Sequence, residues 1–203
     1  MDGLFAMGSE MSREQWTMVA TLVVVVSLGA VLLALAHYGS KGPIAQAREA
    51  ALHRMLVQVL PPHDNAPARA TVEEGGHRIY IARSHGEVVG FSWSVVAPDG
   101  YQGAINILLG VDVDGTIHAI RVITHSETPG LGDGIVNNQP WIDQFIGQTL
   151  GSINWAVRKD GGDFDQFTGA TITPRAVVSA VHRGVEWFVQ HRRSIVHLAE
   201  TAQ

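Results

Sequence analysis

The chain has 203 residues, 46% of them hydrophobic, and its 14 Lys and Arg against 19 Asp and Glu give a net charge of -5. This length suits one soluble domain with accessory segments, and the charge balance excludes the basic surface that nucleic-acid binding needs. The absence of cysteine excludes disulfides, cysteine-ligated iron–sulfur clusters and haem attached through C-x-x-C-H. No two of the ten His lie three or four residues apart, so no helical His pair for a metal exists and no metal site is expected.

An uncharged apolar run at residues 17–36 follows a short N-terminal tail, residues 1–16. As an α-helix this run would span ~30 Å, the hydrocarbon thickness of a bilayer. Trp16 and Tyr38 flank it, as aromatic residues do at membrane interfaces. The run therefore predicts a transmembrane helix. The alternative is a signal peptide cleaved after Ala34-Leu35-Ala36, but its apolar core would exceed the usual roughly 7–15 residues.

The segment after the apolar run predicts a connecting helix and then an antiparallel sheet. The connecting helix, 37–62, has apolar residues at helical spacing from Ile44 to Leu60, with a break expected at Gly42-Pro43 and an end at Pro61-Pro62. A polar loop, His63–Gly76, follows. Asp114-Gly115 predicts a hairpin turn between the last two of four strands. The strands are expected where β-branched and aromatic residues gather, at His77–Ser84, Glu87–Ala97, Ala104–Val113 and Thr116–Thr124.

Two further helices and a short strand are expected in the second half of the chain. Pro140–Leu150 carries apolar residues on one helical face, and Ile153–Val157 has the composition of a short strand. The last helix, Arg175–His191, repeats apolar residues at helical spacing and precedes a tail, 192–203, that is expected to fray. The outer domain, 63–191, is thus expected to be α+β, with an antiparallel sheet and packed helices.

A Gly-rich loop, His125–Gly134, comes directly after the last predicted strand. Pro129 restricts its backbone, and its apolar Leu131 could lie against a flat ring while backbone groups bond the polar edge of that ring. No Lys-Ser or Lys-Thr follows, so the loop is not a nucleotide-binding P-loop. From composition alone, a turn without a ligand is the simpler interpretation.

The stretch Asp165–Pro174 joins a polar, Gly-rich segment to the last helix. Pro is favoured at the first helical position, so the helix is expected to begin at about Pro174 with Thr173 as its cap. Free backbone N–H groups and the positive end of the helix dipole favour a phosphate there, and the small Gly169 and Ala170 would let a ligand approach closely. From spacing alone, a simple loop-to-helix entry is the commoner arrangement.

This stretch and three longer motifs resemble a known family. The stretch is similar to the D-x-x-[ST]-G-A-T signature of flavin-binding domains, through Asp165, Thr168, Gly169, Ala170 and Thr171. The C subunit of the sodium-pumping NADH:quinone reductase shares this signature and is a more distant relative. The longer motifs resemble those of the G subunit of the Rnf ion-translocating electron-transport complex: A-P-D-G-Y-x-G-A-I (Ala97–Ile105), E-T-P-G-L-G-D (Glu127–Asp133) and W-A-V-x-K-D-G-G-D-F-D-Q-F-T-G-A-T-I-T-P (Trp155–Pro174).

The resemblance implies FMN joined by a phosphoester to Thr171, installed by a separate flavin transferase that uses FAD as donor. Thr171 would then be a tether, and no catalytic residue is expected. The resemblance also implies that Asp165 helps recognition by the transferase. Lys159 either bonds the flavin phosphate or ring carbonyls or is a solvated surface side chain. The expected cofactor-binding residues are Asp165, Thr168, Gly169, Ala170, Thr173, Glu127, Thr128, Leu131 and Lys159.

The resemblance further implies a place and a role in the cell. It puts the domain on the periplasmic side of the bacterial inner membrane, anchored by one helix. There the chain would pass electrons among the other Rnf subunits, while the complex couples ferredoxin and NAD redox chemistry to ion transport. It would be a subunit of a translocase without an independent catalytic site. In a chain without cysteine, the flavin is the only evident redox centre.

Two other functions are compatible with parts of the sequence. A single-span periplasmic sensor or scaffold, with Thr171 unmodified, would account for the anchor and the mixed domain equally well. A hydrolase using Ser179, His182 and Asp165 is a weaker alternative, because no G-x-S-x-G motif is present and Ser179 and His182 suit an ordinary helix face.

Overall fold

A computed structural model describes residues 13–202, without the side chains of residues 36, 38–46 and 48. The chain divides into two compact units, residues 1–48 and 49–203, which are described separately. The described part of the first unit is helical and belongs to α1, which runs from Arg13 to Val59. The residues of α1 from Glu49 onward belong to the second unit. Its backbone stays helical at residues 42–43, so the predicted break there is wrong; a helix can continue through proline at the loss of one hydrogen bond.

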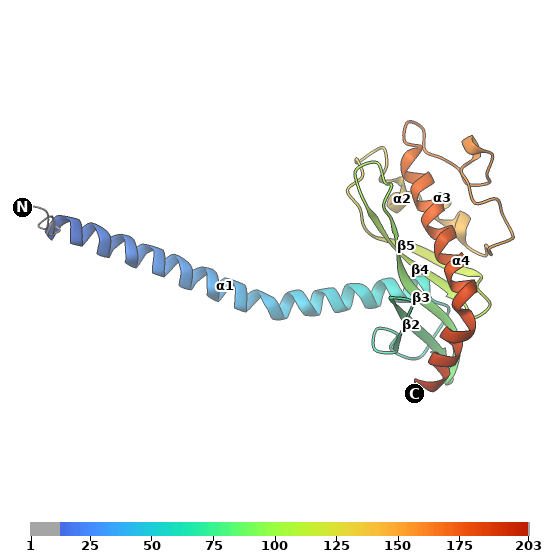
Figure 1. The fold of residues 1–203 in the computed structure, drawn as a ribbon, viewed down its shortest axis with the longest axis horizontal. Helices are drawn as coiled ribbons and strands as arrows, with labels where there is room; N and C mark the ends of the chain where they lie inside the picture. The colour runs from blue at the N-terminus through green and yellow to red at the C-terminus, as the bar shows by residue number, and fades with distance from the viewer. Residues whose placement is uncertain (1–12, 203) are drawn as a thin grey trace, which may run out of the picture. The chain divides into compact units, whose positions relative to one another are not determined.

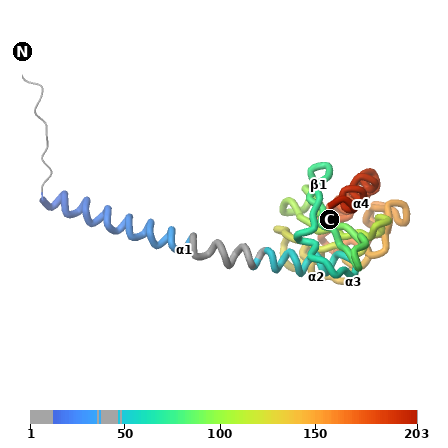
Figure 2. Tube along the Cα trace, turned by 90° about the horizontal axis from the view of Figure 1, so that it is seen from below, coloured from blue at the N-terminus to red at the C-terminus, as the bar shows by residue number. Residues whose placement is uncertain are grey.

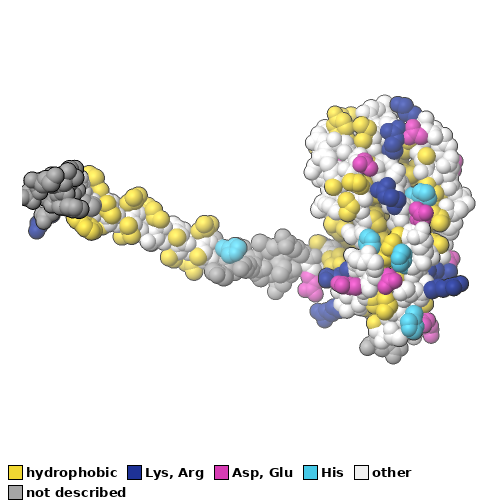
Figure 3. Space-filling model, in the orientation of Figure 1, with side chains coloured by type: hydrophobic (Ala, Val, Ile, Leu, Met, Phe, Trp, Pro, Cys, Tyr) yellow, Lys and Arg dark blue, Asp and Glu magenta, His cyan; other side chains and the backbone are white. Residues whose placement is uncertain are grey.

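The segment Arg13–Leu35 of α1 is long and apolar enough to cross a membrane, and none of its side chains is buried in the described part of the chain. Figure 3 shows hydrophobic side chains along this segment, whereas the surface of the second unit mixes acidic, basic and apolar groups. An apolar helix without a protein partner is stable in hydrocarbon, where its backbone groups bond one another. The segment therefore fits a single-pass membrane anchor, and its helix begins before the predicted residue 17.

The second unit is built on a five-stranded antiparallel sheet in the order β1-β2-β3-β4-β5. All four predicted strands are confirmed, with the hairpin at Asp114-Gly115 joining the last two. The fifth, β1, was missed because its four residues, three of them polar, lie in the segment expected to be a loop. It pairs with β2 across a turn at Gly75-Gly76. The strands are β1 (Thr71–Glu74), β2 (His77–Ser84), β3 (Glu87–Ala97), β4 (Ile105–Asp112) and β5 (Ile117–Thr124).

One face of the sheet is covered by the last helix, α4 (Ile172–Thr201), which lies across the strands in Figure 1. Alternate residues of the central strands point to this face, and the ring of Trp93 stacks on that of Phe188 with centroids 5.4 Å apart. A Cβ on Gly184 would lie within 3 Å of Val95 and Leu109, so the missing side chain lets the helix approach the strands closely.

The other face of the sheet is covered by the last turns of α1, which lie on the opposite side of the strands from α4 (Figure 2). A Cβ on Gly110 would overlap the carbonyl oxygen of Val59, so these turns rest directly on the backbone of β4. The predicted connecting helix is therefore part of the domain core. The buried residues of this layer are Leu56, Val59, Leu60, Ala82, Leu108 and Ala119.

The segment between β5 and α4 is less regular than predicted. In place of one helix over Pro140–Leu150 it has short helical pieces, because the Asn138 side chain caps a new helix and Gly147 turns the chain with φ 78°. The predicted strand Ile153–Val157 is also wrong, since only an isolated bridge between Val157 and Phe164 forms. The pieces are α2 (Gly134–Asn137), α3 (Gln139–Ile142), η1 (Asp143–Phe145) and η2 (Arg158–Asp160).

Both ends of α4 differ from prediction. The helix begins at Ile172, two residues before Pro174, because proline fits anywhere in the first turn, where an N–H has no helical acceptor. It continues past His191 to Thr201, so the expected frayed tail is wrong. Ile195 is buried there, and the Arg83 guanidinium donates to the carbonyl of Ala199 near the helix end. With these corrections, the α+β class with one N-terminal helix is confirmed.

Candidate functional site

A hollow of about 150 Å³ lies where α4 begins. Four segments form it: the loop before β4, the Gly-rich loop after β5, the turn at Gly169, and the first turn of α4. Seven of the residues predicted to bind or carry the cofactor line it, although they come from two segments more than thirty positions apart. Its lining consists of Tyr101, Glu127, Thr128, Leu131, Gly132, Gly169, Ala170, Thr171, Ile172 and Thr173.

Thr171 immediately precedes α4 and lines the hollow. Its backbone is already helical, with φ -75° and ψ -26°, and its side chain does not cap the helix. No hydrogen bond to the Thr171 hydroxyl is found among the described residues, although such a position usually carries a capping side chain. The hydroxyl and the first N–H groups of α4 are thus both available to a ligand.

The turn before Thr171 places the chain around Gly169, whose φ of 79° favours glycine. The N–H of Ala170 donates to the carbonyl of Phe167 at 3.1 Å and closes the turn. The ring of Phe167 lies against Gly134, where a Cβ would come within 2.8 Å of the ring, and against Trp141, with centroids 5.1 Å apart. The turn is therefore held on one side by the aromatic core.

Glu127 joins the hollow to the scaffold behind it. Its side chain is buried, with 4% exposed, and one carboxylate oxygen accepts a hydrogen bond from the hydroxyl of Thr173. The other oxygen accepts from the backbone N–H of Gln102 at 3.0 Å. One carboxylate thus connects the Gly-rich loop, the first turn of α4 and the loop before β4. Thr173, predicted to be the cap, lies inside the helix and serves this contact instead.

The Gly-rich loop presents Leu131 to the solvent side of the hollow. The carbonyl of Thr128 accepts from the N–H groups of Leu131 and Gly132, both at 3.1 Å, and Asp133 accepts from the N–H of Gly130 at 2.8 Å. These bonds make a compact turn whose Leu131 side chain is 50% exposed beside Gly169. A rigid turn with an exposed apolar side chain is suited to contact a flat ring.

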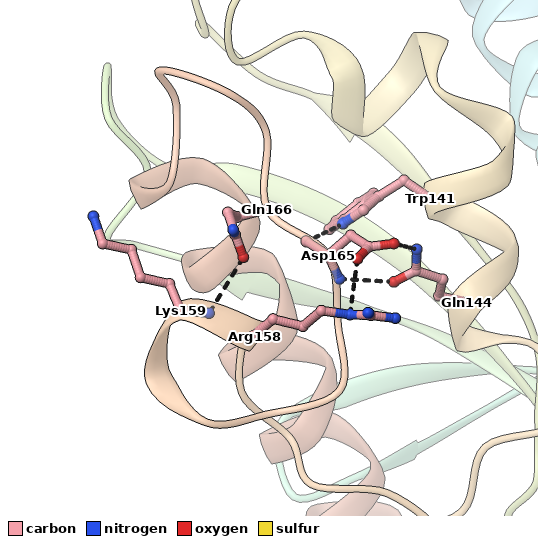
Figure 4. Close-up of polar contacts among 6 residues, drawn as sticks. All are labelled: Trp141, Gln144, Arg158, Lys159, Asp165 and Gln166. Carbon is pink, nitrogen blue, oxygen red and sulfur yellow. Dashed lines mark hydrogen bonds and ion pairs between the residues drawn. The ribbon is translucent and has the colours of Figure 1, made fainter.

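Three predicted residues, Asp165, Thr168 and Lys159, do not line the hollow. Figure 4 shows the Asp165 side chain between Gln144 and Arg158, whereas the Lys159 side chain points away from them. Thr168 is exposed in the loop between Asp165 and the hollow. Asp165 therefore acts within a separate cluster, and Lys159 lies on the surface.

Sequence reasoning missed several residues of this region. Tyr101 and Ile172 line the hollow with side chains 65% and 46% exposed. A signal for Tyr101 existed, because it lies within the A-P-D-G-Y motif. Gln144 and Arg158 contact Asp165 but carry no local signal, since the first of these contacts joins residues 21 positions apart. The ring of His182 stacks on Trp155 at 5.3 Å, which gives no support to a Ser179–His182 hydrolase.

An ion pair between Asp160 and Arg175 ties the segment before the turn to α4 and should be sensitive to acid. Arg175 donates to both carboxylate oxygens, at 2.6 and 3.0 Å, and this bond lowers the pKa of Asp160 below its ordinary value of 3.8. A lowered pKa stabilises the folded chain above the unfolded pKa, and the contribution is lost as the pH falls through the folded value. Thermal unfolding should therefore show Asp160→Asn slightly less stable than the unchanged chain at pH 7. The difference should disappear once acid has protonated Asp160; an equal difference in acid would contradict this.

Comparisons with known proteins cover most of the chain. Residues 100–186 match the FMN-binding domain family. The G subunit of the ion-translocating oxidoreductase complex of Cereibacter sphaeroides is 45% identical over 180 residues, covering 83% of this chain and 82% of that protein. The protein of the same name from Pseudomonas aeruginosa is 41% identical over 190 residues, covering 86% and 89%.

The crystal structure of Shewanella oneidensis NqrC is similar to 59% of this chain and 60% of that chain, with a TM-score of 0.47 and 23% identity. Identity above 40% across more than four-fifths of both chains is the stronger finding, and it confirms the resemblance seen in the motifs. The chain belongs to the family of ion-translocating oxidoreductase complex G subunits.

Proposed function

We propose that the chain is a membrane-anchored electron-transfer subunit of an Rnf-type ion-translocating complex, with FMN joined by a phosphoester to Thr171. The single observation that carries this proposal is the Thr171 hydroxyl, which lines a hollow at a helix N-terminus without a capping bond. The family-matched segment, 100–186, contains every residue of that hollow.

The residues of the hollow fit a flavin phosphate. The first N–H groups of α4 and the positive end of its dipole would stabilise the phosphate charge. Gly169 has no side chain to obstruct the group, and Leu131 and Tyr101 offer exposed apolar surface for a ring. At about 150 Å³ the hollow is smaller than the roughly 300–1,000 Å³ of pockets that enclose a whole ligand. It would hold part of the flavin and leave the rest open to a redox partner.

Thr171 acts as the tether in this proposal. Its hydroxyl oxygen would bond to the phosphorus of the FMN half of FAD, with AMP leaving and the hydroxyl proton passing to solvent, in the active site of a flavin transferase. The bound flavin supplies an acceptor and donor of one or two electrons. The chain's own residues then fix its place: α4 and the turn at Gly169 hold the phosphate end, and the Gly-rich loop contacts the ring.

The proposed location follows from the anchor and the family. The α1 segment Arg13–Leu35 would hold the chain in the bacterial inner membrane, with the second unit in the periplasm. The partners would be the other subunits of the complex, which exchange electrons with the flavin while ferredoxin and NAD redox chemistry drives ion transport.

Loss of the hydroxyl should abolish attachment. When the full chain is expressed with an exported flavin transferase, intact-mass measurement should find one FMN phosphoester on the unchanged chain and none on Thr171→Ala. Thr171→Ser keeps a hydroxyl and should still be labelled, and Thr201→Ala, at the far end of α4, should be labelled like the unchanged chain.

Two results would count against the proposal. Labelling of Thr171→Ala would place the attachment elsewhere. An unmodified native chain that shows no reversible bleaching with dithionite would favour the sensor or scaffold function.

A further inference from the structure

Both carboxylate oxygens of Asp165 have partners within the protein, and the side chain is 50% exposed. Gln144 donates from Nε2 to Oδ2 of Asp165 at 2.6 Å, and its Oε1 accepts from the N–H of Asp165 at 2.9 Å. Arg158 donates from Nε to the other carboxylate oxygen, Oδ1, at 2.9 Å. Figure 4 shows Gln144 beside the carboxylate and Arg158 below it. Neither oxygen of Asp165 is left without a partner.

The backbone around Asp165 is fixed as well. The indole N–H of Trp141 donates to the carbonyl of Asp165 at 2.7 Å, and the same indole packs edge-on against Phe167 two residues later. Trp141 is itself buried, with 2% exposed. One rigid side chain therefore holds two points of the segment that leads to Thr171.

Beyond these contacts the segment has little support. Gln166, Thr168 and Gly169 are exposed. Gln166 accepts from the N–H of Lys159 at 3.3 Å, Phe167 packs on Gly134, and Gly169 lies beside Leu131. The next buried hydrogen bond to the scaffold is the Thr173–Glu127 bond inside α4. The buried contacts that set the path of the chain from Asp165 to Thr171 are thus those of Asp165 and Phe167 on one side and of Thr173 on the other. A fixed geometry at a reacting group is worth a large factor in rate, because a displacement of about 1 Å can slow a reaction by about a hundredfold.

We propose that the Asp165 carboxylate serves to hold its own segment in place through Gln144 and Arg158. These two are then positioning residues that present the Thr171 hydroxyl for flavin attachment. The proposal rests on the function proposed above. It assigns to Asp165 a different role from recognition by the transferase: the carboxylate shapes the substrate segment, and the transferase meets that shape.

Shortening the side chains of Gln144 or Arg158 should slow FMN attachment, as loss of the Asp165 carboxylate would. Gln144→Ala removes two hydrogen bonds from a half-buried site and should slow FMN attachment about tenfold. Arg158→Ala removes an exposed ion pair and should slow it only about two- to threefold. Gln139→Ala is the matched control, because the Gln139 side chain on α3 donates to Asp143 and not to Asp165, and it should not change the rate.

Exchanging donor and acceptor between the side chains of Asp165 and Gln144 distinguishes a positioning role of Asp165 from recognition by the transferase. In Asp165→Asn alone, the new amide faces the Gln144 amide or Arg158, donor against donor. In Gln144→Glu alone, two carboxylates face each other. In the double variant the new amide donates to the new carboxylate, the backbone N–H keeps an acceptor, and Arg158 keeps the remaining oxygen. The double variant should therefore recover attachment to within about threefold of the unchanged chain.

The experiment times FMN attachment by purified transferase with FAD and Mg²⁺ on each full-length, flavin-free variant in detergent. It also measures hydrogen exchange of the amides at 166–170, a readout that needs no flavin. Gln144→Ala should exchange faster there, and the double variant should return to the unchanged pattern. A double variant that is labelled as slowly as Asp165→Asn, with exchange restored, would overturn the inference and assign Asp165 to the transferase. An unlabelled native chain with the expected exchange pattern would instead overturn the proposed function alone.

Discussion

Replacement of Gly110 by Ala should destabilise the second unit by about 3 kcal/mol, the upper end of the usual cost of overpacking. A Cβ at this position would overlap the carbonyl oxygen of Val59 and lie 2.6 Å from its carbonyl carbon. The obstacle is backbone at the end of α1, so no side-chain rotation can relieve it. Either the last turns of α1 must move off the sheet, exposing Leu56 and Leu60, or β4 must shift against β3 and β5.

Thermal unfolding of the full chain in detergent, followed by tryptophan fluorescence, should show this as a midpoint lowered by many degrees. Gly151→Ala is the matched control. A Cβ there meets nothing within 4 Å, and its backbone does not lie in the left-handed region, so its midpoint should stay unchanged. Equal midpoints for Gly110→Ala and the unchanged chain would contradict the direct packing of α1 on the strand.

Substitution of Glu127 by Gln should lower the free energy of unfolding by about 2 kcal/mol, the next largest effect after Gly110→Ala. Both partners of the carboxylate, the Thr173 hydroxyl and the Gln102 N–H, act as donors. The amide oxygen can accept from only one of them. If the NH₂ group faces the Thr173 hydroxyl, that hydroxyl must accept instead of donate and loses its own acceptor. The space is too small for rearrangement, because a Cβ on Gly132 would already lie within 3 Å of the Glu127 side chain. The first turn of α4 should loosen as a result.

The midpoint of thermal unfolding and hydrogen exchange at 171–175 measure this loss. Thr173→Val should destabilise the chain too, since it leaves one oxygen of Glu127 without its donor. The two changes combined should cost less than their sum, because they remove the same contact. Glu186→Gln, an exposed acid on α4, is the control. Additive effects of the two substitutions would show that Glu127 and Thr173 stabilise the chain independently.

The sheet was largely predictable because its signals are local. Strands such as β3 and β4 are rich in β-branched and aromatic residues, and Asp114-Gly115 specifies a hairpin by itself. The four residues of β1, of which only Val72 is apolar, have no such pattern, and only their pairing with β2 makes them a strand. The start of α4 was placed two residues late, because proline marks the first turn of a helix without fixing its first residue.

The site also has residues that local sequence motifs predict and residues that only the fold brings together. Thr171, Gly169 and Leu131 were found from contiguous motifs, and the structure places all three around one hollow. Which groups lie behind them depends on contacts over long separations: Glu127 meets Thr173 across 46 positions, and Gln144 meets Asp165 across 21. Motif spacing carries no information about such pairs, so the roles of Glu127 and Asp165 in the scaffold emerged only with the fold.

The continuity of α1 limits where the chain can be truncated. A fragment starting at Pro61, where the helix was expected to stop, would keep every strand and the whole hollow. It would also expose Ala82, Leu108 and Ala119 to water, since the residues that shield them belong to the same helix as the anchor. A water-soluble version of the domain therefore has to retain the helix from about Glu49 onward, and proteolytic release at the membrane surface would leave an intact fold only if it occurs ahead of that residue.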